Sequence, residues 1–212
     1  MSAGEIIIAI MLAAASYMAG SIPFGVVVAR LTGAQDPRTL GSGRTGGTNA
    51  LRAMGRKRAL MVVTGDLLKG VVPVLVARYL TGNAGVEVLC ALFAILGSTR
   101  SMFVGFKGGR GVGTSVGTMA VIFPPALLVG FPVFAGVILA TRYVSLGSLL
   151  ATAAGAALLA IWWLAANGAV APAYPVYATV GTALVWLAHA DNIRRLLTGT
   201  ERRFDLDLLA RD

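Results

Sequence analysis

Residues 145–165 read SLGSLLATAAGAALLAIWWLA and contain no charged side chain. A helix needs about 20 apolar residues to cross the hydrocarbon core of a bilayer, so this segment predicts a membrane-spanning helix. Its small residues at 153–157 favour close packing against neighbouring helices in lipid. The bilayer therefore decides the fold class, and the rest of the chain is interpreted outward from this helix.

The composition of the whole chain agrees with a membrane fold. Of its 212 residues, 57% are hydrophobic and only 13% are charged, whereas a soluble domain carries about 25% charged residues. Together with 145–165, this predicts an all-α fold, a polytopic membrane helical bundle of about seven transmembrane helices in a single domain, 1–212. The other predicted spans are 5–30, 58–80, 84–104, 112–123, 124–141 and 170–190.

Two of the apolar blocks need closer interpretation. Pro124-Pro125 interrupts 112–141, and proline cannot continue a helix without losing backbone hydrogen bonds. We therefore expect two spans joined by a tight turn, with one long kinked helix as the alternative. The first block, from Glu5 to Leu31, is too long for the apolar part of a signal peptide and lacks a preceding basic segment, so we expect no cleavage.

The basic residues predict how the bundle is oriented. With the N-terminus outside and the C-terminus in the cytoplasm, 16 of the 18 Lys and Arg residues fall on the cytoplasmic side, and only Lys69 and Arg78 do not. Cytoplasmic loops are enriched in Lys and Arg, so we expect this orientation. The net charge of +9 lies between spans, which favours anionic lipid headgroups or anionic substrates as partners and not nucleic acid.

Three residues inside the apolar blocks are interpreted as structural. Lys69 is costly within a membrane unless it is paired, and Asp66 at i−3 is the expected partner. Cys90 is the only cysteine, which excludes an internal disulfide and a metal site of several cysteines. We expect Cys90 to be an inert packing residue.

The first polar motif is Gly41-Ser42-Gly43-Arg44-Thr45-Gly46-Gly47-Thr48-Asn49, followed by Arg52. Its glycines let backbone N–H groups approach an anion closely. The hydroxyl and amide side chains add donors, and Arg52 offers a fork that matches a phosphate. We favour an anion site here over the alternative of a flexible surface loop.

The second polar motif is Phe106-Lys107-Gly108-Gly109-Arg110-Gly111-Val112-Gly113-Thr114, which leads straight into a predicted span. Backbone donors at a helix N-terminus, beside Lys and Arg, again suit a phosphate. The spacing of a nucleotide-binding Walker loop is absent, so we reject that interpretation.

The third polar motif, His189-Ala-Asp-Asn192-Ile-Arg-Arg195, lies at the inner end of the last predicted span. His189 is the only histidine, and Asn192 follows it by three residues, so the two share a helix face. A lone histidine at an interface is usually a satisfied polar group. Its interest here is that all three motifs fall on the same predicted face of the membrane.

Taken together, these motifs resemble the bacterial acyl-phosphate-dependent glycerol-3-phosphate acyltransferases, in order and over most of the chain. The matching stretches are Gly20-Ser21-Ile22-Pro23-Phe24-Gly25, Asp36-Pro37-Arg38, the first polar motif, Asp66-Leu67-Leu68-Lys69-Gly70 with Pro73, the second polar motif to Val112, Arg142-Tyr143-Val144-Ser145-Leu146, and His189 through Leu197 with Gly199-Thr200-Glu201. The family's fold has seven spans with its N-terminus outside. The chain departs from the family pattern at Arg44, Ser98 and Arg110, where asparagine, histidine and lysine are usual.

The resemblance implies an enzyme of the bacterial inner membrane with its active site facing the cytoplasm. It would transfer an acyl group from acyl phosphate to the 1-hydroxyl of glycerol 3-phosphate, giving lysophosphatidate and phosphate, the first acylation of phospholipid synthesis. It implies no metal and no other cofactor, and we expect a monomer. The substrate-binding residues that we predict are Ser42, Gly43, Thr48, Asn49, Arg52, Lys107, Gly108, Gly109, Arg110, Gly111, His189 and Asn192.

The resemblance divides these residues between two substrates. Ser42, Arg52, Arg110, His189 and Asn192 would hold the glycerol phosphate, and the loop 107–111 would help to bind acyl phosphate. Because acyl phosphate is already activated, direct attack by the hydroxyl is the simplest scheme, and no residue is assigned as nucleophile or base. The alternatives are a divergent paralogue with an altered substrate, an organic-phosphate transporter, and a structural or regulatory membrane protein. Transporter sites usually lie near the middle of the membrane, which favours the enzyme.

Overall fold

A computed structural model describes residues 2–167 and 169–209, and within these residues it contains helices and no strand. The α-helices are α1 (Ala3–Ser21), α2 (Phe24–Thr32), α3 (Gly47–Met54), α4 (Arg56–Thr81), α5 (Ala84–Thr99), α6 (Val112–Ile122), α7 (Pro125–Thr141), α8 (Val144–Ala165), α9 (Ala173–Ala188) and α10 (Ala190–Leu197). Short 3-10 helices lie at η1 (Pro37–Thr39), η2 (Met102–Val104) and η3 (Leu206–Leu209). The predicted all-α fold is confirmed.

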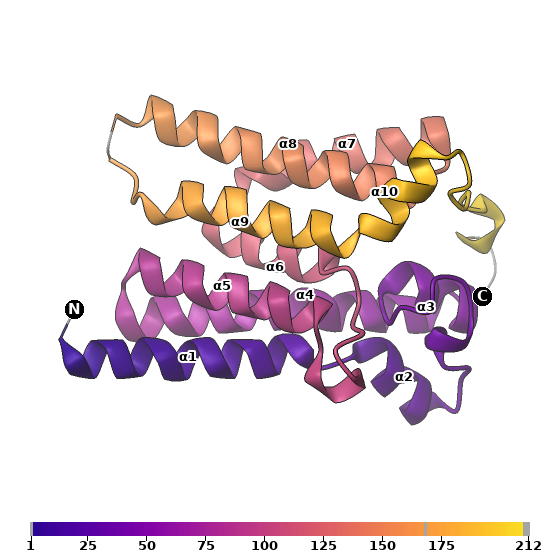
Figure 1. Ribbon diagram of the computed structural model, residues 1–212, viewed down its shortest axis with the longest axis horizontal. Helices are drawn as coiled ribbons and strands as arrows, with labels where there is room; N and C mark the ends of the chain where they lie inside the picture. The colour runs from indigo at the N-terminus through magenta and orange to yellow at the C-terminus, as the bar shows by residue number, and fades with distance from the viewer. Residues whose placement is uncertain (1, 168, 210–212) are drawn as a thin grey trace.

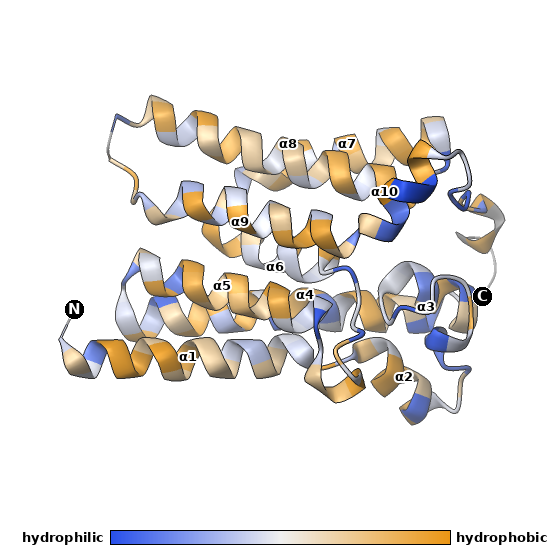
Figure 2. Ribbon diagram, in the orientation of Figure 1, coloured by the Kyte–Doolittle hydropathy of each residue, from blue (hydrophilic) through white to orange (hydrophobic). Residues whose placement is uncertain are grey.

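The long helices run side by side along one axis of the bundle (Figure 1). Helix α1 packs on α5, α4 packs on α5 and α6, and α9 joins α5 to α8, against which α7 packs. The start of α1 and the end of α10 lie at opposite ends of the bundle (Figure 1). Hydrophilic residues gather at the end that carries α3 and α10, while the long helices are mostly hydrophobic (Figure 2).

Four described helical segments are long and apolar enough to cross a membrane, namely Ala3–Ser21, Arg56–Thr81, Ala84–Val104 and Val144–Ala165. Three shorter apolar helices are α6, α7 and α9. Large apolar side chains cover the outer surface of the bundle, such as Ile10 and Met11 of α1, which are 61% and 65% exposed. Such a surface is stable in lipid and not in water. Each of the seven segments overlaps one of the seven predicted spans.

Some predicted boundaries are wrong. The span 5–30 is not one helix, because the helix is interrupted at Pro23, between α1 and α2. Proline has no N–H to donate and disfavours a helical conformation in the residue before it. The span 170–190 ends at Ala188, and the chain turns at His189 into α10. The motif predicted as a loop after Gly41 contains helix α3. By contrast, the choice of two helices over one across Pro124-Pro125 is confirmed.

Glycines bring α6 very close to α4, which fixes where the second polar motif lies. A Cβ atom at Gly70 of α4 would collide with the carbonyl oxygen of Thr114, and one at Gly117 of α6 would collide with that of Leu67. Only glycine permits this separation of the two backbones. The N-terminus of α6, where the motif ends, is therefore held against α4.

Ion pairs anchor the middle and the C-terminal end of α4. Lys69 lies 2.7 Å from Asp66, as predicted, and its Nζ also donates to the carbonyl of Ile22 at the break between α1 and α2. Toward the C-terminal end, Arg78 pairs with the buried Glu87 of α5 at 2.8 Å. Arg78 also donates to the carbonyl of Val121 and so links three helices. Cys90 is buried and free, as the packing role requires.

Candidate active site

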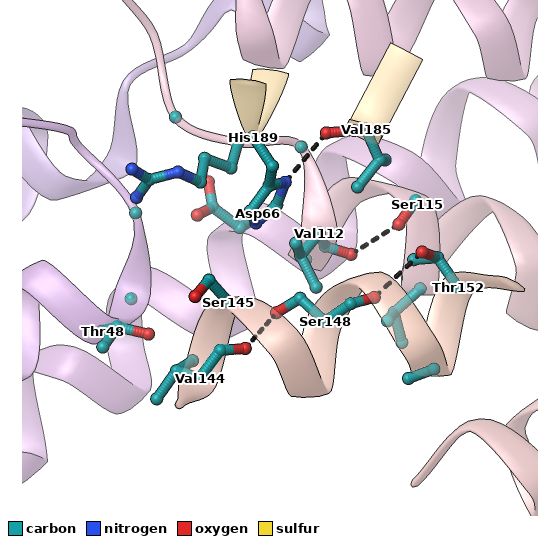
Figure 3. Close-up of a pocket in the computed structure, with 18 of the residues that line it drawn as sticks. Thr48, Asp66, Val112, Ser115, Val144, Ser145, Ser148, Thr152, Val185 and His189 are labelled. Atoms are coloured by element: carbon teal, nitrogen blue, oxygen red, sulfur yellow. Dashed lines mark hydrogen bonds between the residues drawn. The ribbon is translucent and has the colours of Figure 1, made fainter. Parts of the chain in front are cut away.

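The three polar motifs surround one pocket of about 380 Å³ at the hydrophilic end of the bundle. Its polar mouth is lined by residues of 42–52, 109–113 and 189–202, and its deeper part by apolar residues of α6, α7, α8 and α9. In Figure 3, side chains of these segments, among them Thr48, Ser145 and His189, face a common space with Asp66 of α4. The pocket is therefore amphipathic along its length.

Two helix N-termini open onto this pocket. Helix α3 begins after Gly46 and helix α6 after Gly111, and neither has a side chain that caps its first N–H groups. Gly46, Gly47 and Gly113 line the pocket beside them. Uncapped N-termini present backbone donors and the positive end of the helix dipole, so both favour bound anions.

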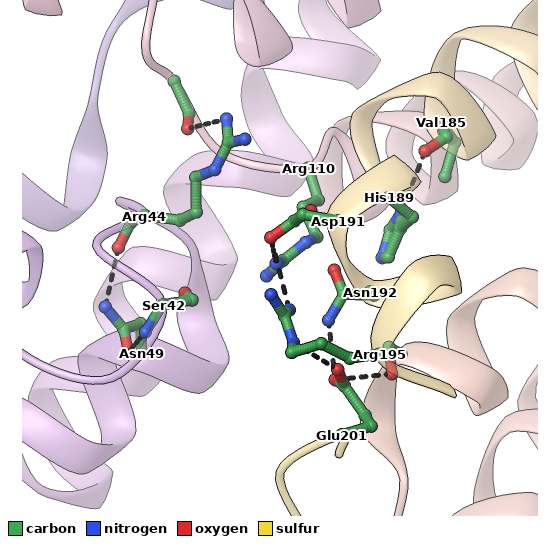
Figure 4. Close-up of polar contacts among 12 residues, drawn as sticks. Ser42, Arg44, Asn49, Arg110, Val185, His189, Asp191, Asn192, Arg195 and Glu201 are labelled. Atoms are coloured by element: carbon green, nitrogen blue, oxygen red, sulfur yellow. Dashed lines mark hydrogen bonds and ion pairs between the residues drawn. The ribbon is translucent and has the colours of Figure 1, made fainter. Parts of the chain in front are cut away.

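Asn49 lines the pocket and also organises the first motif. Its amide nitrogen donates to the carbonyls of Pro37, Leu40 and Arg44, and its oxygen accepts from the backbone N–H of Ser42 (Figure 4). These bonds occupy the polar atoms of Asn49, which is 3% exposed. Asn49 thus shapes the turn that brings Ser42 to the pocket. Gly43 does not line the pocket and has φ +67°, as this turn requires.

Several backbone N–H donors of the second motif are used to hold its own loop in place. The backbone N–H of Lys107 donates to Val104, that of Gly108 to Thr99 and that of Gly109 to Ser98. Lys107 is exposed, and neither Lys107 nor Gly108 is among the residues that line the pocket. Gly109, Arg110 and Gly111 do line it.

Arg44 connects the two glycine-rich motifs, because its Nη1 donates to the carbonyl of Gly108 at 3.4 Å. The two segments are far apart in the sequence, and this contact joins them beside the pocket that both motifs line. Arg44 itself lines the pocket. The sequence predicted Arg44 as part of the first anion-binding motif and as a departure from the family pattern.

A network of ion pairs fixes Arg110 and the start of α10. Asp191 lies 2.9 Å from Arg110 and 3.2 Å from Arg195, and Arg195 lies 2.8 Å from Glu201 (Figure 4). Glu201 also accepts hydrogen bonds from Ser145 at 2.9 Å and Asn192 at 2.6 Å. Burial alone would raise the pKa of Glu201, but the hydrogen bonds from Asn192, Arg195 and Ser145 outweigh it and lower that pKa.

Arg44, Arg52 and Arg202 line the pocket without an ion pair in the part of the chain that the structure describes. Burial lowers the pKa of Arg52, and the neighbouring charge of Arg202 lowers it further. Two guanidinium groups that repel each other across a pocket are stabilised by a bound anion. The mouth therefore carries positive charge that the described carboxylates leave uncompensated.

His189 and Asn192 provide the complementary kind of group, unpaired acceptors. His189 Nδ1 lies 2.8 Å from the carbonyl oxygen of Val185, which can only accept, so Nδ1 carries the proton and Nε2 is left as an acceptor. His189 lies just after the end of α9, and burial lowers the pKa of its imidazole to about 4. The ring is therefore neutral at pH 7. Asn192 Oδ1 is buried and, within the described residues, has no partner. Both acceptors suit hydroxyl groups of a ligand.

Several residues of this site could not be assigned from the sequence. Asp191, Arg195 and Arg202 had no assigned role, and Ser145 and Glu201 were noted only for the resemblance. The i, i+4 spacing of Asp191 and Arg195 was the one available signal for an ion pair. Within the described residues, no cluster of three or more His, Cys, Asp or Glu side chains could hold a metal ion.

Comparison with known proteins gives a consistent result. The profile of the family described as glycerol-3-phosphate acyltransferase matches residues 10–199. The glycerol-3-phosphate acyltransferase of Syntrophotalea carbinolica is 44% identical over 192 residues, 90% of this chain and 94% of that protein. That of Geobacter sulfurreducens is 41% identical over 195 residues, 92% of this chain and 97% of that protein.

Two solved structures share the whole fold. They are crystal structures of PlsY (YgiH), an integral membrane glycerol 3-phosphate acyltransferase, in its glycerol 3-phosphate form and its lysophosphatidic acid form. The TM-scores are 0.86 and 0.83, the identities 38% and 36%, and each match covers 95% of this chain and 98% of the other. The chain therefore belongs to the glycerol-3-phosphate acyltransferase family of integral membrane proteins, whose reaction belongs to phospholipid synthesis.

Proposed function

We propose that the protein transfers an acyl group from acyl phosphate to the 1-hydroxyl of glycerol 3-phosphate, giving lysophosphatidate and phosphate. The observation that carries this proposal is a single pocket with two uncapped helix N-termini and unpaired arginines at its mouth and apolar walls below. Two phosphates and one apolar tail are the features of these two substrates. The solved relatives, which are named for glycerol 3-phosphate and lysophosphatidic acid forms, support the same substrates.

Glycerol 3-phosphate would be held by Ser42, Arg52, Arg110, His189 and Asn192. The two arginines would bind its phosphate through charge-assisted hydrogen bonds. His189 Nε2 and Asn192 Oδ1 would accept hydrogen bonds from its hydroxyl groups, which explains why both atoms lack a protein partner in the described residues. Thr48 and the N-terminus of α3 would add donors at the same mouth.

Acyl phosphate would place its phosphate at the N-terminus of α6, beside Gly109, Arg110 and Gly111. Arg44 would complete this site, because it reaches the second motif across the mouth. The acyl tail would extend into the apolar part of the pocket. Asn49, Gly43 and Gly108 would act by shaping the two motifs and not by touching substrate, and exposed Lys107 would attract anions to the mouth.

The reaction would proceed by direct attack. The 1-hydroxyl oxygen forms a bond to the acyl carbon, the bond from that carbon to the phosphate oxygen breaks, and the hydroxyl proton passes to the departing phosphate. Positioning and stabilisation of charge by the arginines and helix N-termini would supply the catalysis. An acylated Ser42 is disfavoured, because within the described residues no base or carboxylate hydrogen-bonds to its hydroxyl.

We also propose that the seven apolar segments all cross the bacterial inner membrane, with the N-terminus outside and the pocket facing the cytoplasm. The charge asymmetry supports this orientation. Single cysteines introduced into 31–57, 101–111 and the segment after 190, in a chain with Cys90→Ser, should resist a membrane-impermeant thiol reagent in sealed cells. Labelling of any of the three segments in sealed cells contradicts the orientation.

Purified protein given glycerol 3-phosphate and an acyl donor tests the function. Acyl phosphate should give lysophosphatidate and free phosphate in equal amounts, and acyl-CoA and acyl carrier protein should give neither. An equal rate with acyl-CoA overturns the choice of donor. Transport of glycerol 3-phosphate into vesicles without any acylation supports the transporter, which the position of the polar residues at one end of the bundle disfavours (Figure 2).

A further inference from the structure

The apolar part of the pocket has walls from four helices. Its deepest lining residues are Met119 of α6, Ala126 of α7, Gly155 of α8 and Tyr177 of α9. Ser148 and Thr152 of the same wall, drawn in Figure 3, bond to backbone carbonyls of their own helix and leave no free donor for a ligand. The chamber therefore suits an unbranched apolar group.

A closed floor lies directly beyond these residues. Leu159 follows Gly155 by one helical turn and is 0% exposed. Ile122 and Phe123 are each 7% exposed, and the Phe123 ring stacks on Trp162 with ring centroids 4.7 Å apart. Ile122, Phe123 and Leu159 belong to one core cluster with Ala126 and Tyr177, so the cavity ends in packed side chains.

The depth of the chamber follows from helix geometry. Ser145 and Asn192 mark the polar end, since both bond to Glu201. At 1.5 Å per residue, Gly155 lies about 15 Å from Ser145 along α8, and Tyr177 lies about 18 Å from His189 along α9. Carbon–carbon bonds of about 1.5 Å at about 111° advance a chain by roughly 1.25 Å per atom. An extended tail of about 12–14 carbon atoms therefore reaches the floor.

One side of the chamber reaches the surface of the bundle. Phe131 of α7 lines the pocket and is 56% exposed, so this wall of the chamber is accessible. A tail that enters sideways from the bilayer at this wall and lies along the chamber meets the floor with its far end. Side access and a closed floor together make length the property that the chamber senses.

We propose that this floor measures the acyl tail, with Leu159 as its end and Gly155 as the position that keeps the last turn of the chamber open. The inference rests on the proposed acyl-transfer function and adds its chain-length specificity. A Cβ atom at Gly155 would lie 3.5 Å from that of Ala126, an ordinary contact. Alanine there fits without moving α7 and narrows the space above Leu159.

The experiment compares kcat/KM for acyl phosphates of 12 and 18 carbon atoms in single preparations of wild type, Leu159→Ala and Gly155→Ala. Leu159→Ala deepens the chamber and should raise the 18-to-12 ratio roughly tenfold, and Gly155→Ala should lower it severalfold. Because both substrates are measured in the same preparation, the ratio does not depend on the fraction of protein that is folded. Leu164→Ala, on the same helix but 67% exposed, is the control and should keep the wild-type ratio.

A second readout separates this inference from the proposed donor. Lysophosphatidates with 12- and 18-carbon acyl tails should raise the thermal unfolding midpoint in detergent. In Leu159→Ala, this stabilisation should shift toward the 18-carbon tail, as the transfer rates do. Absence of transfer from any acyl phosphate, with the length shift in binding retained, refutes the donor and supports the floor. Unchanged ratios in both variants, whether of transfer or of binding, refute the floor.

Discussion

Removing Arg52 should weaken glycerol 3-phosphate binding with little effect on the fold. Arg52 lies in the last turn of α3, lines the pocket and, in the described part of the chain, has no carboxylate partner. Its replacement by alanine therefore breaks no ion pair; it relieves repulsion from Arg202 and removes a smaller attraction to Glu201, which keeps Arg195 as its partner. A hydrogen bond to a charged group contributes about 1.5–3 kcal/mol. The expected loss in kcat/KM is therefore roughly 10- to 150-fold.

The assay is steady-state kinetics with glycerol 3-phosphate varied at saturating acyl phosphate. A contact made equally in the ground and transition states appears in KM alone, and a contact that tightens at the transition state lowers kcat as well. Arg52→Lys should retain part of the activity, because the charge remains and the planar fork is lost. Arg58→Ala removes an exposed arginine outside the pocket and is the matched control. Wild-type kinetics in a folded Arg52→Ala protein would refute the site assignment.

Four other changes test separate parts of the structure. Glu201→Gln should lower the unfolding midpoint at pH 7 and make that midpoint less dependent on acidic pH. In the wild type, the carboxylate of Glu201 contributes its full stability above the unfolded pKa of about 4.3, and this stability is lost as the pH falls through the lowered pKa of the folded state. Arg202→Ala should raise KM for glycerol 3-phosphate severalfold, whereas Arg203→Ala, whose guanidinium lies 6.0 Å from the Tyr143 ring, should not. His189→Ala should raise KM without abolishing turnover, and complete loss in folded protein would indicate a catalytic base. Arg78→Ala should lower the unfolding midpoint because Glu87 is left buried and unpaired, and unchanged melting would contradict this.

The two ion pairs of α4 show which contacts the sequence predicts and which it does not. The pair of Lys69 with Asp66 follows from spacing on one helix, and the structure confirms it at 2.7 Å. The pair of Arg78 with Glu87 joins two helices across a turn, and no periodicity predicts it.

Local composition was a weaker guide to the individual residues that contact a ligand. Glycine content predicted two anion-binding motifs, and both line one pocket, but it could not tell which N–H groups remain available. Those of Gly108 and Gly109 turn inward to Thr99 and Ser98, and the amide of Asn49 is used within its own loop. Each of these bonds depends on a partner whose position is set by packing. A donor count from sequence therefore exceeds the donors that a ligand meets.

The amino-acid sequence by itself determined the membrane class, the seven apolar segments and the three polar motifs, because these depend on local hydrophobicity, charge and glycine content. Tertiary structure alone decided that Arg110, Asp191, Arg195 and Glu201 form one network and that the N-termini of α3 and α6 face one cavity. It also decided where the chamber ends, at Leu159 and the Phe123–Trp162 stack. The physical reason is that such contacts join residues far apart in the chain, and their geometry depends on how whole helices pack.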